Sequence, residues 1–341
     1  MRFQNVSLES ICYHLPETIL TSEDIEHQLR DCREALGLTA GRLEAITGIR
    51  ERRVWPVGTR PSSVAAIAGR KALDAAGVDP KNIGLLIHAG VCRDATEPST
   101  ANVAHHLLGL EPGCIVFDVS NACLGFLNSM MIAADLIQLG RITHAMVVSG
   151  ENAGPIYQDT IASIKLDPSP THLFKSIASL TLGSAALACV LCSADQAKFG
   201  HTLLGGLSQA DSEAHDVCQG YGDINHQSMV TDTARMMERG LALSQVTWEF
   251  FKKDLAWEND TADHIFHHQV SRSHSQRAYE ILQLDGAKKQ SDLEWLGNTG
   301  SVAVPLSMAL RADDGHFRPH DKIALLAIGS GLNCLMMGLE W

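Results

Sequence analysis

The chain alternates short apolar runs with longer segments whose apolar residues have helical spacing, and this alternation is the feature that most restricts its fold. Runs of a length typical of buried strands occupy residues 83–88, 114–120, 145–149 and 184–193. Helical spacing occupies residues 62–76, 100–110 and 123–139. A strand that is apolar on both faces needs helices on both sides of its sheet. The first half therefore predicts an α/β fold with a largely buried sheet.

The second half of the 341-residue chain repeats this theme in a looser form. Helices are expected at residues 229–256, 271–284 and 304–310, and strands at 263–268, 322–328 and 332–339. The polar, Pro-containing stretch 151–181 is expected to be irregular. We therefore predict two similar α/β halves packed together, residues 1–195 and residues 196–341.

Composition excludes several partners and compartments. A formal net charge of −12 argues against nucleic acid or an anionic membrane as a general partner. Nine scattered cysteines, an odd number, indicate a reducing cytoplasm more than a secreted disulfide framework. Cys189 and Cys192 form a C-x-x-C, but they fall in an apolar run and are interpreted as strand residues rather than a redox or zinc motif.

Neither end of the chain has the pattern of a membrane or targeting segment. Residues 1–5 lack a basic region followed by a long apolar stretch. The longest apolar tract, residues 323–341, is interrupted by Gly329, Gly331 and Asn333. This pattern favours two buried strands joined by a glycine turn over a membrane helix.

Cys123 lies where the expected strand 114–120 gives way to a helix that begins at Leu124. A thiol in this position faces the first free N–H groups of the helix, whose dipole favours the nucleophilic thiolate. The following helix is apolar nearly all round, so it is expected to be buried and to place the thiol at the bottom of a pocket. A buried structural cysteine is the alternative interpretation.

Two further residues complete a plausible catalytic set. His268 ends the expected strand 263–268, and Asn298 lies in a glycine-flanked turn, positions where catalytic groups collect in α/β proteins. With Cys123 they would form a nucleophilic and electrostatic site. A metal site built from His264, His267 and His268 is the competing interpretation. On a strand, however, His267 would face away from the other two.

Five motifs resemble the ketoacyl synthase III branch of the thiolase superfamily. They are TGIRERR at residues 47–53, SNACLGF at 120–126, HQVS at 268–271, GNT at 297–299 and IGSGLN at 328–333. Their order and their spread over nearly the whole chain make the resemblance specific.

The resemblance implies a thiolase fold, with two halves in a five-layered α-β-α-β-α arrangement, and usually a homodimer. Cys123 would take an acyl group from a thioester, with the backbone N–H groups of Cys123 and Ser330 forming the oxyanion hole. His268 and Asn298 would donate hydrogen bonds to the carbonyl oxygen of the second thioester. No cofactor and no metal is implied, because the substrates are fatty acyl-CoA or acyl-carrier-protein thioesters.

Glu97, just before Pro98, sharpens the resemblance. Decarboxylating members of the family generally have an apolar residue at this position, whereas the olefin-biosynthesis members resemble this chain here and at residues 3–7 and 329–334. The resemblance implies that Glu97 enters the partner subunit's pocket as a base. A plain acyl thioester must lose an α-proton before it can attack, and a carboxylate in an apolar pocket suits that task. The alternative is a loop or helix-start acid.

The predicted activity is a non-decarboxylative Claisen condensation of two acyl thioesters, which gives a β-keto acid or a β-ketoacyl thioester. An α-pyrone-forming ketosynthase would use the same residues, and a decarboxylating 3-oxoacyl-ACP synthase III is a further alternative. Many family members carry a tryptophan before the TGIR segment that stacks on the CoA adenine. Residues 41–46 contain none and Trp55 lies beyond it, so the choice between CoA and a carrier protein is open.

Two other classes fit the residues less well. The order Cys123, His268, Asn298 is also that of papain-like hydrolases, but the local context around their cysteine is absent. A non-catalytic scaffold would require a degenerate site, yet every recognised catalytic position is intact. Acyl-chain lengths and the final product are not predicted. Enzymes that act downstream in the pathway are expected partners.

Overall fold

The computed structural model describes residues 1–223 and 226–341. Ten strands are linked into one sheet in the order β12-β11-β13-β14-β8-β1-β7-β6-β4-β5. One end of the sheet contains β1 (Val6–His14), β4 (Leu85–Ala89), β5 (Ile115–Val119), β6 (His144–Glu151) and β7 (Ala185–Ser193). The other end contains β8 (His201–Ala210), β11 (His264–His267), β12 (Lys289–Gln290), β13 (Lys322–Gly329) and β14 (Asn333–Glu340).

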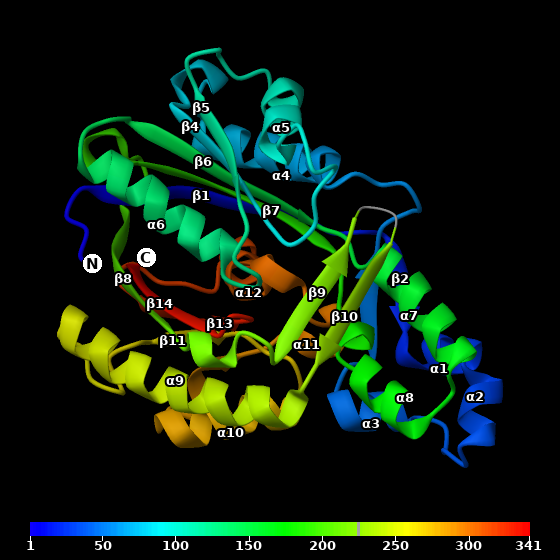
Figure 1. Cartoon of the computed structure of the whole chain (residues 1–341). Coiled ribbons are helices and arrows are strands. Elements are labelled where there is room, and N and C mark those ends of the chain that lie inside the picture. The colour runs from blue at the N-terminus through cyan, green and yellow to red at the C-terminus, as the bar shows by residue number, and fades with distance from the viewer. Residues whose placement is uncertain (224–225) are drawn as a thin grey trace.

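The helices divide the molecule into five layers (Figure 1). The outer layers contain α4 (Pro61–Ala76) and α5 (Thr100–Leu108) on one side, and α9 (Thr233–Leu255) and α10 (Arg272–Leu282) on the other. Between the two ends of the sheet lie α6 (Gly125–Gln138) and α12 (Ala303–Asp313). The largest apolar core surrounds this middle layer. The expected α-β-α-β-α arrangement is confirmed, and the apolar helix after Cys123 is its buried centre.

The two ends of the sheet meet through antiparallel pairing of β1 with β8, at Ser7–Thr202 and Leu8–His201. All five strands at one end come from residues 1–195, and all five at the other come from residues 196–341. The division of the chain into two halves at residue 195 stays a prediction. If it holds, the β1–β8 pairing is where the two halves join.

Parallel pairing sets the edge at which the site forms. β4 pairs in parallel with β5 and with β6, and β11 pairs in parallel with β13. The carboxyl ends of parallel strands meet at one edge of a sheet, where loops can carry functional groups. The Cys123 segment follows β5, His268 follows β11, and the glycine turn at residues 329–331 follows β13. The tract 323–341 forms the two buried strands expected, and Cys189 and Cys192 lie buried in β7.

The expectation that residues 151–181 are irregular is wrong. They form α7 (Gly154–Leu166) and α8 (Pro170–Ser176). Pro155 and Pro170 stand in the first turn of these helices, where the missing N–H is not needed and the fixed φ suits the helix. The prolines therefore begin helices here rather than break them.

The long helix expected at residues 229–256 begins later. β9 (Cys218–Gly222) and β10 (Gln227–Thr231) form a hairpin, and Asp232 then caps α9 through the backbone N–H of Arg235. Pairing with β9 supplies the hydrogen bonds that take residues 229–231 out of the helix. The remaining elements are α1 (Ser22–Gln28), α2 (Arg30–Ala35), α3 (Arg42–Thr47), β2 (Thr18–Thr21), β3 (Glu51–Val54) and α11 (Leu293–Leu296). Within the described ranges, no helix has both the length and the apolar character to cross a bilayer.

Candidate active site

Cys123 lies on a tight turn between β5 and α6. The preceding residue, Ala122, has φ of 44°, a left-handed conformation that non-glycine residues rarely adopt. Such strain persists where the surrounding structure over-determines it, which is typical of functional sites. Helix α6 begins at Gly125, with Leu124 as its N-cap. The turn therefore presents Cys123 just before the helix rather than within it.

The glycine turn that follows β13 packs directly against the backbone of Cys123. A Cβ atom added to Gly329 would lie 3.1 Å from the Cys123 backbone N and 2.6 Å from a Leu124 methyl group. A side chain here would require both neighbours to shift, so glycine suits this close approach. The turn places Gly329 against the Cys123 backbone, and Ser330 is the next residue. An oxyanion hole built from the backbone N–H groups of Cys123 and Ser330 stays a prediction.

A chain of asparagine side chains holds the two turns together. The Asn333 Nδ2 donates to the Asn121 Oδ1 at 3.1 Å and to the Ser330 carbonyl at 3.3 Å. The Asn121 Nδ2 in turn donates to the Asn128 Oδ1 at 2.8 Å. Asn121 and Asn333 lie in the sequence motifs, but no role was predicted for them. Their hydrogen bonds fix the Ser330 turn against the Cys123 turn.

The structure corrects the expectation that the Cys123 thiolate is favoured. Burial raises the pKa of the Cys123 thiol to about 12, and the negative charge of Glu151 acts in the same direction. The nearest N–H groups of the turn are already used, because Leu124 N donates to the Asn121 carbonyl at 2.9 Å and Gly125 N donates to the Ala122 carbonyl at 3.4 Å. The free thiol is therefore protonated at neutral pH and must lose its proton during acyl transfer.

His268 and Asn298 lie at the same edge, both buried. The backbone N–H of His268 donates to the Leu326 carbonyl of β13 at 2.8 Å, which ties the residue to the strand that leads into the glycine turn. The Asn298 Oδ1 accepts the Gly300 N–H at 3.0 Å. This bond leaves the Asn298 Nδ2 as the end of the amide that can donate to a substrate oxygen.

His268 is neutral in this environment. Burial lowers its pKa to about 4, and the neighbouring His274 adds to the shift. The buried Nδ1 has no hydrogen-bond partner among the described residues. A neutral imidazole can donate one N–H to a developing oxyanion and can accept a proton through its other nitrogen.

The lowered pKa of His268 predicts a pH dependence of stability. An unfolded histidine titrates near 6.5, so between about pH 6.5 and pH 4 the unfolded chain binds the proton and the folded chain does not. The stability due to the neutral His268 is therefore present above pH 6.5 and is lost as the pH falls. Urea unfolding should show a fall in the free energy of unfolding between pH 7 and pH 5 that is smaller by about 2 kcal/mol in His268→Asn than in the wild type. Equal falls would contradict a buried neutral His268.

The other two histidines of the strand region have separate partners. His267 Nε2 lies 2.6 Å from the Ser275 Oγ, and His264 Nε2 lies 2.9 Å from the Asp321 carboxylate. Across residues 1–223 and 226–341, no three His, Cys, Asp or Glu side chains gather as a metal site would require.

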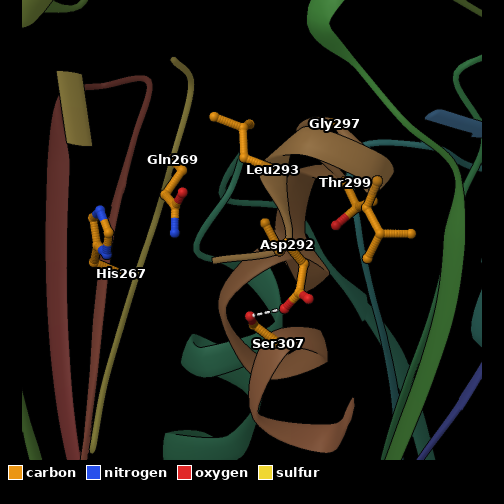
Figure 2. A pocket seen from close by; sticks show the side chains of 9 residues that line it. His267, Gln269, Asp292, Leu293, Gly297, Thr299 and Ser307 are labelled. Atoms are coloured by element: carbon orange, nitrogen blue, oxygen red, sulfur yellow. Dashed lines mark hydrogen bonds between the residues drawn. The ribbon is translucent and has the colours of Figure 1, made fainter. Parts of the chain in front are cut away.

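A small cavity lies between the end of β11 and the segment that contains Asp292, Leu293, Gly297 and Thr299 (Figure 2). Its volume is about 20 Å³, room for one water molecule and not for an acyl chain. His267 and Gln269 reach it from the end of β11, and Asp292 and Ser307 are hydrogen-bonded to each other on its other side. The Arg311 guanidinium pairs with Asp292 at 3.1 Å. This polar layer supports the two segments and is not a substrate pocket.

Glu97 is exposed on the loop between β4 and α5. Both ends of this loop are anchored. Asp94 accepts the Ser62 backbone N–H at 2.9 Å, and Asp118 accepts the N–H groups of Thr100 and Ala101 at 2.8 and 2.7 Å. The Ser99 side chain and Asp118 cap the start of α5, so Glu97 takes no part in the cap. The alternative of a helix-start acid is therefore not supported.

Trp55, which follows the TGIR segment, packs mainly within the chain. Its ring is buried, its Nε1 donates to the Glu151 carbonyl at 3.0 Å, and the His14 ring lies 5.2 Å away. Trp55 borders a cavity of about 910 Å³ beside Asp94, but none of the four predicted catalytic residues lines that cavity. The indole supports the end of β6.

Two family models match the chain in the regions that carry the site. The model described as 3-oxoacyl-[acyl-carrier-protein] synthase III matches residues 117–206, and the model for its C-terminal part matches residues 253–341. The first includes Cys123, and the second includes His268, Asn298 and Ser330. Together with the five-layer fold, and with full-length relatives at 35–36% identity, these matches show that the chain belongs to the 3-oxoacyl-[acyl-carrier-protein] synthase III family of the thiolase superfamily.

Within this family the chain is similar to two proteins named acyl-CoA:acyl-CoA alkyltransferase. It is 35% identical to the one from Shewanella oneidensis and 36% identical to the one from Xanthomonas campestris, in both cases over the whole of each chain. A crystal structure of a Xanthomonas campestris OleA variant superposes with a TM-score of 0.96 at 35% identity, covering 100% of this chain and 98% of that one. A 3-oxoacyl-(acyl carrier protein) synthase III from Xanthomonas oryzae superposes with a TM-score of 0.95 at 36% identity, covering 100% of both chains. The resemblance seen in the sequence is confirmed.

Proposed function

We propose that this chain condenses two fatty acyl-CoA molecules head to head, without decarboxylation, through an acyl group carried on Cys123. The observation that carries the proposal is the exposed Glu97 on an anchored loop, in a chain whose relatives are named acyl-CoA:acyl-CoA alkyltransferases. Decarboxylation forms a carbanion without a base, whereas condensation of two plain acyl groups requires one. The activity is that of an acyltransferase of the condensing-enzyme class.

The first half-reaction transfers an acyl group to Cys123. The thiol sulfur attacks the thioester carbonyl, the carbon–sulfur bond to CoA breaks, and the thiol proton leaves with CoA. The backbone N–H groups of Cys123 and Ser330 would stabilise the oxyanion of this step.

The second half-reaction forms the carbon–carbon bond. Glu97 takes an α-proton from the second acyl-CoA, whose carbonyl oxygen gains negative charge and accepts hydrogen bonds from His268 and Asn298. The carbanion attacks the acyl-Cys123 carbonyl, and the thiolate leaves and is reprotonated. The product is a β-ketoacyl-CoA, and hydrolysis of its thioester gives the β-keto acid.

His268→Ala and Asn298→Ala are expected to separate the two half-reactions. Each variant should retain acylation of Cys123 and lose roughly 100- to 1,000-fold in condensation rate, because each removes a donor to the second substrate's oxyanion. Stopped reactions with acyl-CoA, analysed by intact-mass spectrometry of the protein and mass spectrometry of the product, measure both steps. Equal losses in the two steps would favour a Cys–His couple of the hydrolase type.

The site would be completed across a homodimer. β5 is the last strand at its end of the sheet, so one edge of its backbone has no strand partner among residues 1–223 and 226–341. Unpaired edges are natural places for a second chain to add. Ile115 on this strand is 48% exposed and Val91 at the start of the Glu97 loop is 55% exposed. A second copy paired here would cover these apolar side chains and receive Glu97.

Complementation tests this arrangement. Cys123→Ala and Glu97→Ala homodimers should each be inactive in condensation. Mixed dimers that contain one chain of each should recover part of the activity, because one of their two sites has both groups intact. Dimers of defined composition can be purified with two different affinity tags. No recovery in verified mixed dimers would assign Glu97 to the site of its own chain.

The experiment that tests the activity is incubation with acyl-CoA of several chain lengths, followed by mass spectrometry of products and protein. A β-ketoacyl product that contains two complete acyl chains supports the proposal. A product that forms only with a malonyl thioester would support the second candidate, a decarboxylating 3-oxoacyl-ACP synthase III, which the Xanthomonas oryzae structure favours. A pyrone product would identify a third candidate, the α-pyrone-forming ketosynthase. The same series with acyl-carrier-protein substrates shows whether the acyl donor is CoA or a carrier protein. We also propose a cytoplasmic location.

A further inference from the structure

Glu151 is a buried carboxylate beside the site that sequence reasoning did not single out. It is the last residue of β6 and is 3% exposed. Its carboxylate accepts the backbone N–H groups of Val91 at 3.1 Å, Cys92 at 3.3 Å and Ser301 at 3.1 Å, and the Ser301 hydroxyl at 2.5 Å. No Lys, Arg or His among the described residues forms an ion pair with it. These four donors are what satisfies the buried charge.

The donors belong to the two segments that the second half-reaction needs in place. Val91 and Cys92 begin the loop that carries Glu97, and Ser301 follows the turn that carries Asn298. The carboxylate lies between glycines of these segments. A Cβ atom on Gly300 would lie 3.2 Å from the Glu151 Cδ, and a Cβ atom on Gly90 would lie 3.3 Å from its Oε1. One side chain thus joins both segments to the end of β6.

The same carboxylate adds negative charge near Cys123. Gly90, which it contacts, lies beside Gly125 at the start of α6. The titratable groups that face it are His88 on β4, Cys92 after β4 and Cys123 before α6. Burial lowers the pKa of His88, so that imidazole does not neutralise the charge at neutral pH. Glu151 therefore opposes ionisation of the nucleophile while it orders the groups that act on the second substrate.

We propose that Glu151 is a positioning residue with opposite effects on the two half-reactions. Its hydrogen bonds to the residue 91–92 and residue 301 segments hold the Glu97 loop and Asn298 in register for condensation, and its negative charge adds to the effect of burial in opposing ionisation of the Cys123 thiol. The predicted effect on condensation rests on the proposed two-step function, whereas the predicted effect on thiol ionisation does not.

Glu151→Gln is the principal test, because it keeps the size of the side chain and removes the charge and half of its acceptor capacity. The rate of Cys123 alkylation by iodoacetamide, followed against pH, should have a midpoint roughly one pH unit lower than in the wild type. Condensation should fall roughly 10- to 100-fold, because a group misplaced by about 1 Å loses that much. Acylation at pH 7 should be unchanged or faster.

Two further variants separate charge from hydrogen bonding. Ser301→Ala keeps the charge and removes the shortest hydrogen bond, so it should lower condensation relative to acylation with the alkylation midpoint unchanged. Glu9→Gln is the matched control. Glu9, on β1, is also 3% exposed, but its carboxylate accepts the backbone N–H of Lys198. Its replacement should leave both readouts at wild-type values.

An unchanged alkylation midpoint in Glu151→Gln, or acylation and condensation that fall in parallel, would overturn the proposal. If Glu151→Gln does not fold, as judged by its thermal unfolding, Ser301→Ala decides: an unaltered ratio of condensation to acylation overturns the positioning role. Alkylation needs no acyl-CoA. A wild-type protein that fails to condense acyl-CoA would therefore refute the proposed function while the charge effect of Glu151 is still measured.

Discussion

Glu97→Gln is expected to lower the rate of condensation of two acyl-CoA molecules by roughly 100- to 10,000-fold, the contribution of a general base. The amide keeps the shape of the side chain but cannot take the α-proton at neutral pH. Acylation of Cys123 should survive, because that step forms no carbanion. Product formation under saturating acyl-CoA measures the first effect, and intact-mass spectrometry of the protein measures the second.

The exposed position of Glu97 permits a clean control. Substitution on an exposed loop should leave stability within about 0.5 kcal/mol of the wild type. Glu111→Gln, which removes another exposed carboxylate just beyond α5, should leave condensation unchanged. A malonyl thioester that is admitted to the site should bypass the Glu97→Gln defect, since it makes its carbanion by losing carbon dioxide. Wild-type condensation of plain acyl-CoA in Glu97→Gln would remove the basis for a non-decarboxylative enzyme.

Cys123→Ser is expected to abolish the covalent acyl adduct and to lower condensation by on the order of 10⁴- to 10⁶-fold, as loss of a catalytic group in a covalent mechanism does. The serine hydroxyl is less acidic than the thiol, and the surroundings of the nucleophile already oppose its ionisation. Intact-mass spectrometry after exposure to acyl-CoA should show one added acyl chain in the wild type and none in the variant.

Cys218→Ser is the matched control for the nucleophile. Cys218 begins β9, is partly exposed like Cys123 and lies near enough to influence its pKa. Its replacement should leave the adduct on Cys123, as peptide mapping will show. An adduct on Cys218 or on any other cysteine in Cys123→Ser would contradict the assignment of Cys123 as the acyl carrier.

Much of the fold follows from local pattern. The apolar runs at 145–149 and 184–193 become the buried strands β6 and β7, and the tract 323–341 becomes β13 and β14. Strands buried on both faces leave a strong signal in sequence. β1, which was not predicted, buries one end completely and the other only in part, so its pattern is mixed. The helices α7 and α8 were missed because Pro155 and Pro170 signal a break except at a helix start.

The predicted catalytic residues were identified from motifs. Each motif is a short stretch of chain, so it can be recognised in the sequence without knowledge of the fold. Cys123, His268, Asn298, Ser330 and Glu97 were all named on that basis. The tertiary structure decided what surrounds them. In the structure burial raises the pKa of the thiol, with the charge of Glu151 acting in the same direction, where the helix start alone had suggested a thiolate. Glu97 is exposed and free of the α5 cap. Charge and burial depend on residues brought together from distant parts of the chain, so no local pattern contains them.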